Sequence, residues 1–442
     1  MIKQAVTGKI RIFFSAVLLF WVARLLGMNL SVPVFLLVLY AYYRQRAFKN
    51  INFLHVFFLF LLNFSISYFI ISKGMPVSWL PFALIPMLAT ILFNDLEVSL
   101  LIAISCGVSI AAVASSHFSL GIIFLASGTL SSILVLGTRR RITVIRAGFI
   151  TGVVQALILF FVDQLWFGPP ARYINLILNS IICSIAVLGI LPLFEYLFKT
   201  VTNISLLELA DFNHPLLQRM IMEAPGTYHH SLIVGNLSDA ACTGIGANGL
   251  LARIGAYYHD IGKIEKSEYF SENQAMQESK HDDLSPSMSK LVIMNHVKEG
   301  VELAKRHRLN PRLVDFIQQH HGTSLVYYFY CRALENLEDD QQVKEEGFRY
   351  SGPKANTKET AIVLLADSVE AATRAMKDHS PGKIEELVYK IINNKFIDRQ
   401  LDECDLTLKD LEKIAEIFIH ILSGIYHSRI TYPEKALKSE PR

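Results

Sequence analysis

The stretch ARIGAYYHDIGKI, residues 252–264, places two side chains that are costly to bury at the end of a segment that otherwise resembles an ordinary packed helix. Small residues recur on one face of this segment at helical spacing, and His259 continues that face. Asp260 follows directly. A buried carboxylate without a partner is unfavourable, so this pair indicates a bound partner such as a metal ion. We expect a helix from about residue 248 to 261, closed by Gly262.

Four other predicted helices in the same half of the chain each carry metal-capable side chains on their apolar stripe. Proline pairs such as Ser285-Pro286 and Asn310-Pro311 mark helix starts. The side chains are His230, His296, the pair His320 and His321, and Asp367, the last within ETAIVLLADSVEAATRAM, residues 359–376. One histidine on an apolar stripe is usually an ordinary core residue. Several such helices that each bring a ligand inward favour a shared metal centre instead.

The ligand types indicate which metals this centre would take. Nitrogen and oxygen donors without thiolate suit manganese, iron or zinc. Seven ligands are too many for one tetrahedral ion and suit two ions that keep water positions open. Asp260 can bridge such a pair, because each of its oxygens can bind one ion.

Composition divides the chain into a membrane half and a soluble half. Of the 442 residues, 52% are hydrophobic, and they are concentrated between Ile10 and Phe198. A formal charge of +3 is too small to indicate binding to a nucleic-acid polymer. The five cysteines are odd in number and lack CxxC spacing, which argues against a thiolate zinc site and a disulfide framework. We expect a transmembrane helical domain over 1–198, a soluble helical domain over 199–430 and a disordered tail over 431–442.

Hydropathy predicts eight membrane spans, or seven because the second is short. The spans are roughly 10–26, 30–43, 51–72, 78–94, 97–114, 119–137, 148–167 and 173–198. With eight spans, most lysines and arginines of the loops, including Arg139 to Arg141, fall on the side of the N-terminus. Positive loops stay in the cytoplasm, so the sequence predicts a multi-pass protein of the cell membrane with its N-terminus and soluble half cytoplasmic.

The order of a first histidine, then His-Asp, then His, His-His and Asp on successive helices resembles the HD-domain metal-dependent phosphohydrolases. The surrounding text is similar to the seven-transmembrane HD-domain (PgpH-type) family, whose members hydrolyse cyclic di-AMP. The segments that carry this resemblance are EAPGTYHHSLIVGNLSDAA (223–241), GAYYHDIGKI (255–264), LSPSMSKLVIMNHVKEGVELAK (284–305), QQHHGTSLVYYFY (318–330) and RYSGPKANTKETAIVLLADSVEAATRAM (349–376). The resemblance covers roughly residues 200–427.

This resemblance implies an all-α HD domain, two divalent ions, iron or manganese, and two ligand sets. It implies that one ion is held by His230, His259, Asp260 and Asp367, and the other by Asp260, His296, His320 and His321. It also implies that a metal-bridging hydroxide hydrolyses cyclic di-AMP to linear pApA. His229 is the rival to His230, but it lies one residue off the inward stripe. Lys263 follows the His-Asp pair, where its charge could neutralise a substrate phosphate.

Two features depart from the family pattern. Only Gly27-Met28-Asn29 follows the first predicted span, where members carry a large extracytoplasmic domain. HD proteins that act on cyclic di-GMP often carry Gly-Tyr-Pro after a His-His pair, whereas Gly322-Thr323-Ser324 stands here and counts against that substrate.

Other readings stay open beside this one. The HD domain could hydrolyse cyclic di-GMP, a deoxynucleoside triphosphate or ppGpp, or it could be a nucleotide-binding membrane receptor without turnover. The sequence does not decide whether the protein forms a homodimer. The charged segment 331–359 is long enough to form a lid over the nucleotide.

Overall fold

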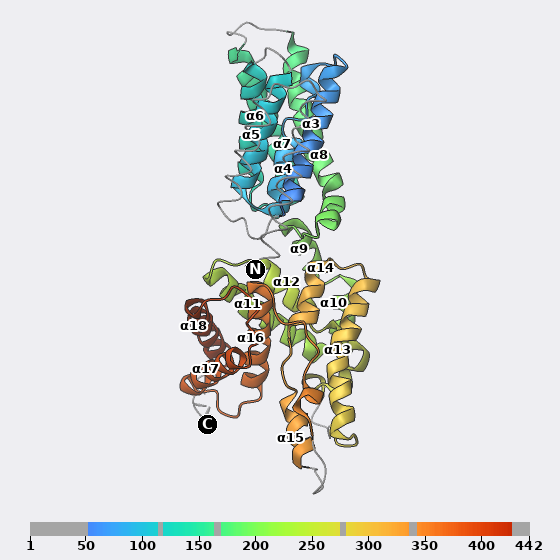
Figure 1. The fold of residues 1–442 in the computed structure, drawn as a ribbon, viewed down its shortest axis with the longest axis vertical. Helices are drawn as coiled ribbons and strands as arrows, with labels where there is room; N and C mark the ends of the chain where they lie inside the picture. The colour runs from blue at the N-terminus through green and yellow to red at the C-terminus, as the bar shows by residue number, and fades with distance from the viewer. Residues whose placement is uncertain (1–51, 114–117, 163–168, 275–279, 336–342, 427–442) are drawn as a thin grey trace, which may run out of the picture. The chain divides into compact units, whose positions relative to one another are not determined.

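The computed structural model describes residues 52–113, 118–162, 169–274, 280–335 and 343–426. Within these ranges every regular element is a helix, and one isolated antiparallel bridge joins Leu325 to Arg349. The all-α fold class predicted from the sequence is therefore confirmed for the described part of the chain. Contacts divide the chain into two compact units between Leu207 and Glu208, and Figure 1 shows the helices of each.

The first unit contains the apolar helices. They are α3 (Phe53–Ser72), the 3-10 turn η1 (Val77–Trp79), α4 (Leu84–Phe93), α5 (Leu96–Val113), α6 (Phe118–Val135), α7 (Arg141–Val162) and α8 (Pro170–Phe198). Three of the described helices, α3, α7 and α8, are long and apolar enough to cross a membrane. The predicted spans 10–26 and 30–43 lie outside the described residues. Helix α7 begins at Arg141, seven residues before the predicted span 148–167.

The predicted span 78–94 is not one continuous helix, and this prediction was wrong. Its helix α4 has 10 residues, which rise about 15 Å, roughly half of a bilayer core. Pro81 and Pro86 lack the amide hydrogen that a continuous helix needs, so the helix starts between them. Leu80 and Phe82, in the non-helical part, are fully buried. Irregular backbone at membrane depth is tolerated where protein covers it.

Aromatic contacts place the ends of several helices on one side of the first unit. The His55 ring, in the first turn of α3, stacks on Phe198 at the end of α8 with centroids 4.2 Å apart. Phe93, the last residue of α4, also stacks on Phe198, at 6.2 Å. The turn between α6 and α7 joins this side, because the Gly137 amide donates to Asn94 Oδ1 at 3.0 Å. The segment from α3 to α8 therefore starts and ends on the same side of its unit.

The short helix α9 (Asn203–Leu209) follows α8 and is tied to it by a buried carboxylate. Glu195, in the penultimate turn of α8, accepts a hydrogen bond from the Thr202 amide at 2.8 Å through Oε1. Its Oε2 accepts a second one from Ser205 Oγ at 2.8 Å. The end of α8 and the start of α9 are thereby held together by side-chain bonds as well as by the chain.

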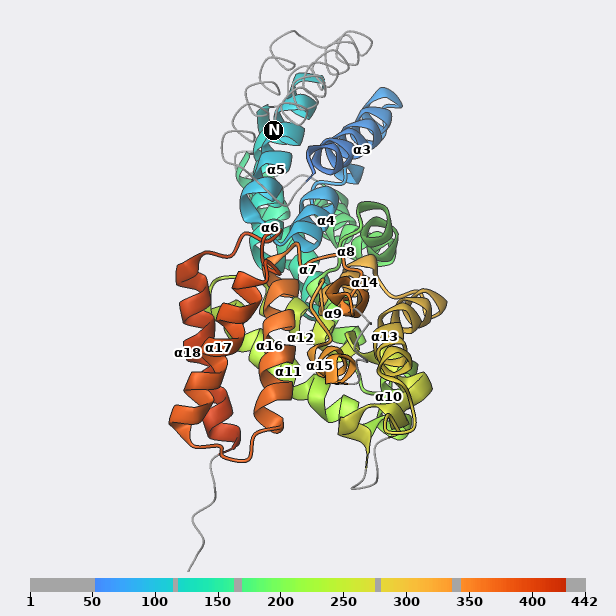
Figure 2. The ribbon, with the colours of Figure 1, turned by 60° about the horizontal axis from the view of Figure 1, so that its bottom comes forward.

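The second unit is a bundle of helices with short 3-10 turns. Its elements are α10 (Pro215–Glu223), α11 (Pro225–Gly244), α12 (Gly249–Tyr258), η2 (Ile261–Tyr269), η3 (Ser271–Asn273), α13 (Pro286–Arg306), α14 (Pro311–Gln319), α15 (Tyr327–Glu335), η4 (Glu345–Phe348), α16 (Lys358–Arg374), α17 (Pro381–Ile397) and α18 (Leu408–Ile425). Ser285 and Asn310 cap α13 and α14 as the sequence predicted. Figure 2 shows α16, α17 and α18 side by side. Helix α11 packs against α12, α16 and α18 and forms the centre of the bundle.

Helix α12 ends earlier than the sequence predicted, and Gly262 does not close it. The helix stops at Tyr258, His259 follows in a helical conformation, and a 3-10 helix begins at Ile261. The role of Gly262 is a close approach to α13: a Cβ atom there would lie 1.8 Å from the carbonyl oxygen of His296. The glycine thus lets the Asp260 segment and α13 touch through their backbones.

Candidate metal centre

The first group of metal-capable side chains comes from three segments of the second unit. His230 on α11, His259 and Asp260 after α12, and Asp367 on α16 each offer one ligand atom, and these atoms lie within 4.8 Å of one another. All four residues are buried. His230 Nε2 lies 3.0 Å from Asp367 Oδ1, and His259 Nε2 lies 3.2 Å from Asp260 Oδ2.

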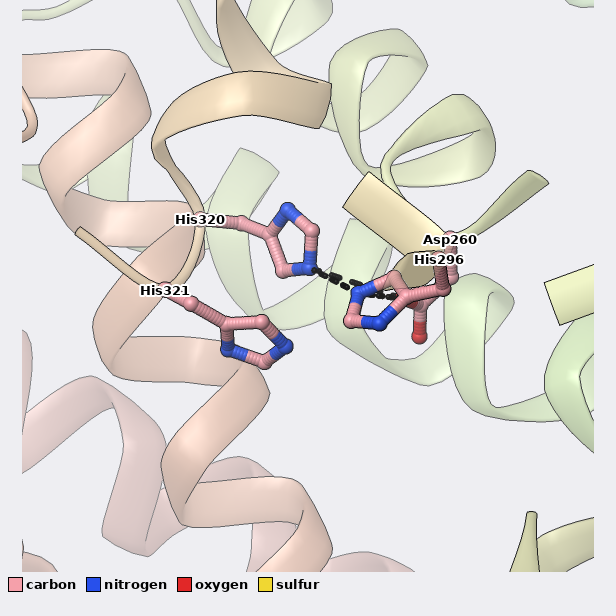
Figure 3. A group of neighbouring side chains, drawn as sticks. All are labelled: Asp260, His296, His320 and His321. Atoms are coloured by element: carbon pink, nitrogen blue, oxygen red, sulfur yellow. Dashed lines mark hydrogen bonds and ion pairs between the residues drawn. The ribbon is translucent and has the colours of Figure 1, made fainter. Parts of the chain in front are cut away.

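The second group shares Asp260 with the first. Asp260, His296 on α13, and His320 and His321 after α14 also bring their ligand atoms within 4.8 Å of one another. Asp260 Oδ1 lies 3.4 Å from His296 Nε2 and 3.5 Å from His320 Nε2. Figure 3 shows the rings of His320 and His321 extending from one loop toward His296 and Asp260. The fold therefore brings together all seven residues singled out in the sequence, in the two groups that the resemblance implied.

The histidine rings are oriented by their Nδ1 atoms. Each of three rings has a backbone carbonyl next to Nδ1: Ala256 at 2.6 Å for His259, Ile293 at 2.5 Å for His296 and Ile317 at 3.0 Å for His320. A carbonyl only accepts, so each Nδ1 carries the hydrogen and donates it. In the neutral form of each ring Nε2 keeps a lone pair, and the three Nε2 atoms face Asp260.

The centre contains buried polar atoms that the protein itself does not satisfy. Within the described residues, His259 Nε2 and Asp260 Oδ1 have no hydrogen-bond partner. Leaving such atoms without a partner costs about 1–3 kcal/mol each. A cation bound between the Asp260 carboxylate and the surrounding histidine nitrogens would satisfy these atoms. The donor set, nitrogen and carboxylate oxygen without sulfur, fits manganese, iron or zinc.

The electrostatics of the centre keep its carboxylates ionised. Burial raises the pKa of Asp260, but the neighbouring His259 and Lys263 outweigh burial and hold it well below its ordinary value. Burial likewise opposes the charged form of His259, yet Asp260 and Asp367 raise its pKa to about 10. His296 differs, because burial and the nearby His320 lower its pKa to about 3 despite Asp260. His296 is therefore neutral at physiological pH and free to donate a lone pair.

Lys263 lies inside the centre and is not a solvated surface lysine. Its Nζ is 2.7 Å from Asp260 Oδ2 and 2.8 Å from Glu272 Oε1. Its side chain is 12% exposed. Asp260 and Glu272 outweigh burial and raise the pKa of Lys263, which stays charged. The sequence singled out Lys263 but did not reveal its partner Glu272, because a glutamate in an irregular segment gives no signal of burial.

Two further residues of the centre were missed by sequence reasoning. Glu370 is fully buried on α16 and contacts His230 Nδ1 through Oε2. It lies three residues after Asp367, so helical spacing places both on one face. Tyr350 stacks on His321 with centroids 4.4 Å apart. Tyr350 belongs to the segment 331–359 expected as a lid, of which 336–342 lie outside the described residues.

The loop that carries His320 and His321 is held by residues distant in sequence. Gln400, fully buried, accepts from the Thr323 amide at 2.8 Å and donates to Thr323 Oγ1 at 3.0 Å. Lys395 Nζ donates to Ser324 Oγ at 2.8 Å. The end of α17, which the sequence indicated only as part of the core, and the residues directly after it thus position this loop. His229 is exposed and outside both groups, in agreement with the preference for His230.

Comparison with known proteins identifies the family of the chain. Residues 18–202 match the family model described as 7TM receptor with intracellular HD hydrolase, and residues 227–372 match the HD domain model. The chain belongs to this family of membrane HD-domain proteins.

Its relatives include two curated bacterial proteins. It is 44% identical over 329 residues to the cyclic-di-AMP phosphodiesterase PgpH of Bacillus subtilis. The match covers 73% of this chain and 46% of that protein. It is 39% identical over 361 residues to PgpH of Listeria monocytogenes. This match covers 80% of this chain and 50% of that protein. The chain thus spans about half the length of these relatives.

A solved structure also matches, that of the L. monocytogenes PgpH HD domain in complex with cyclic-di-AMP. It is 46% identical to this chain and covers 49% of it and 100% of the solved chain, with a TM-score of 0.47.

Proposed function

We propose that this protein is a membrane-anchored, two-metal phosphodiesterase that hydrolyses cyclic di-AMP to linear pApA. The observation that carries the proposal is the pair of ligand groups that share Asp260, one oxygen toward each. The curated relatives, which are cyclic-di-AMP phosphodiesterases by name, supply the substrate. All seven ligand positions hold competent residue types, which favours catalysis over a receptor without turnover.

The reaction adds the oxygen of water to one phosphorus and breaks the bond to the 3′ oxygen, which takes a proton. The product is the linear dinucleotide with a 5′ phosphate. When bound, two divalent cations, iron or manganese, supply hydroxide at neutral pH and offset the charge of the phosphoryl oxygens. Asp260 faces both ligand groups and would hold the pair together.

Lys263 contributes a fixed positive charge beside Asp260. Glu272 holds its ammonium group from the other side at 2.8 Å, so the charge stays beside the candidate metal ligands. Such a buried ammonium group can stabilise a phosphate oxygen more strongly than a solvated one, because water does not screen it. Lys263 is therefore the residue of this chain that we assign to substrate charge.

We also propose that the HD domain lies in the cytoplasm. The turn between α6 and α7, which contains Arg139 and Arg140 and leads to Arg141 at the start of α7, contacts Asn94 on the side of the first unit where α8 ends. Positive loops stay on the cytoplasmic side. Since the soluble half follows α8, both would be cytoplasmic, and the name of the matched family, with an intracellular HD hydrolase, supports this orientation.

The test uses the full chain, purified in detergent, stripped of metal and reloaded with Mn²⁺ or Fe²⁺. It is incubated separately with cyclic di-AMP, cyclic di-GMP, a deoxynucleoside triphosphate and ppGpp, and the products are separated. We expect linear pApA from the first. Survival of cyclic di-AMP while another nucleotide is consumed would refute the substrate. Tight binding of cyclic di-AMP without turnover, in either metal form, would favour the receptor.

The variant Asp260→Ala tests the shared carboxylate, and Asp283→Ala, at an exposed aspartate, is its control. We expect the first to lose both ions and all turnover, because each group loses a ligand. The control should keep both. An Asp260→Ala protein that retains two ions would show that the carboxylate is not shared.

A further inference from the structure

The buried histidines of the centre differ in what stands behind them. The Nδ1 atoms of His259, His296 and His320 face backbone carbonyls. His230 Nδ1 instead faces the carboxylate of Glu370. Among these four rings, His230 is the one whose outer nitrogen is paired with a formal negative charge.

Apart from the contact with His230, the buried carboxylate of Glu370 has few favourable contacts. Its side chain is 1% exposed, and its Oε1 has no hydrogen-bond partner within the described residues. Within the described part of the chain Glu370 also pairs with Arg374, whose Nη1 lies 3.6 Å from Oε1 and whose side chain is 36% exposed. A carboxylate buried at this depth is costly unless it is paired. The imidazole of His230 is the partner that the geometry provides.

The inner nitrogen of the same ring points at the candidate ligand atoms. His230 Nε2 lies 3.0 Å from Asp367 Oδ1 and 3.7 Å from Asp260 Oδ2. If Nε2 binds a cation, Nδ1 must carry the hydrogen and donate it to Glu370. A carboxylate acceptor fixes the tautomer and the ring orientation and makes the imidazole a stronger donor than a carbonyl acceptor does.

Formal charge also distinguishes the two groups, and it too favours cation binding in the group that contains His230. The group with His230 contains two carboxylates, Asp260 and Asp367, and has Glu370 directly behind it. The other group contains Asp260 and three histidines. A cation in the first group would therefore have two carboxylates among its candidate ligands and Glu370 behind His230. A cation in the second group would have one, Asp260, with Asp367 Oδ2 3.6 Å from His321 Nδ1.

We propose that Glu370 is a positioning residue that makes the two cation sites unequal, so that the site of His230 binds its ion more tightly. This inference rests on the proposed two-metal function and adds to it a named cause for the order in which the ions bind. Glu370 acts through His230 and does not touch the substrate or the ions.

The experiment measures binding of Mn²⁺ alone to the metal-free full chain in detergent, with free Mn²⁺ read from its electron paramagnetic resonance signal. The variants are Glu370→Gln, which keeps the shape and removes the charge, His230→Ala and the double variant. Glu416→Gln, at an exposed glutamate on α18, is the matched control. Thermal unfolding of each metal-free protein is recorded alongside.

The wild type should bind two ions with different affinities. Glu370→Gln should weaken the tighter ion by about 10- to 100-fold, the usual effect of losing an outer partner of a ligand, and leave the other nearly unchanged. In the His230→Ala background the same substitution should add nothing, because the residue through which it acts is gone. The metal-free Glu370→Gln protein should unfold at the wild-type temperature or above it.

Three outcomes would overturn the inference: equal weakening of both ions, an effect that adds to that of His230→Ala, or a lower unfolding temperature of the metal-free variant. Each would assign Glu370 to general support of the bundle. A wild type that binds no pair of ions would instead refute the proposed function, and the two failures are therefore distinguishable.

Discussion

Gly262 lies so close to α13 that one added methyl group must separate two segments of the metal centre. In Gly262→Ala, the new Cβ would lie 1.8 Å from the carbonyl oxygen of His296 and 2.5 Å from the amide nitrogen of Gly300. Both atoms belong to the backbone of one helix, so no side-chain rotation relieves the contact.

The size of the effect follows from that distance. Real Cβ atoms rarely approach other atoms closer than 3.0 Å, so α13 must move away from Gly262 by at least about 1.2 Å. Overpacking of this kind typically costs about 1–3 kcal/mol, which lowers the melting temperature of a domain of this size by roughly 2–12 °C. His296 moves with α13 and away from Asp260, and a displacement of about 1 Å can reduce turnover about 100-fold.

The assay compares Gly262→Ala with Gly424→Ala, since an added Cβ at Gly424, in the last turn of α18, meets no atom within 4 Å. Differential scanning calorimetry of the full chain, Mn²⁺ binding and turnover of cyclic di-AMP are measured for both. We expect the first variant to melt lower and to lose the ion of the His296 group before that of His230, and the control to match the wild type. A Gly262→Ala protein with wild-type melting, metal content and turnover would refute the reasoning.

Three further predictions test other parts of the centre. His229→Ala should keep Mn²⁺ stoichiometry and turnover, since His229 is exposed and outside both groups; loss of an ion would reverse the choice between the two histidines. Burial opposes ionisation of Glu272, but Lys263 outweighs it and lowers the pKa of Glu272 from 4.5 to about 2. Denaturant unfolding should therefore show Glu272→Gln to be less stable than the wild type by about 3 kcal/mol above pH 4.5, and this difference should shrink as the pH falls toward 2; a constant difference would contradict the pairing. Gln400→Leu should weaken Mn²⁺ binding about tenfold and speed hydrogen exchange at Thr323, whose amide loses its acceptor; unchanged exchange would show that the loop does not need Gln400.

The candidate ligands can be picked out from the sequence because their signal is local. A histidine or an aspartate on an apolar helix stripe is visible in a single segment, and His-Asp and His-His pairs are visible as dipeptides. The choice of His230 over His229 followed from the same periodicity, and the structure buries the first and exposes the second. The two groups, as opposed to their members, came from the family resemblance.

The features that the sequence did not predict depend on contacts between distant segments. Gly262 was interpreted as a helix end because the 34-residue separation from His296 hides the close approach of α13. The bonds from Gln400 to Thr323 join residues 77 positions apart and leave no local pattern. The interruption of the span 78–94 is different, since Pro81 and Pro86 were visible, but hydropathy measures apolarity and not lost hydrogen bonds.

The short helix α9 is hydrogen-bonded to neighbouring residues at both of its ends. Glu195 of α8 holds its beginning, and the carbonyl of its last residue, Leu209, accepts a hydrogen bond from the hydroxyl of Tyr258 at 2.7 Å. Tyr258 is the residue before His259. The hydrogen bond to Leu209 therefore fixes the residue that stands directly before a candidate ligand.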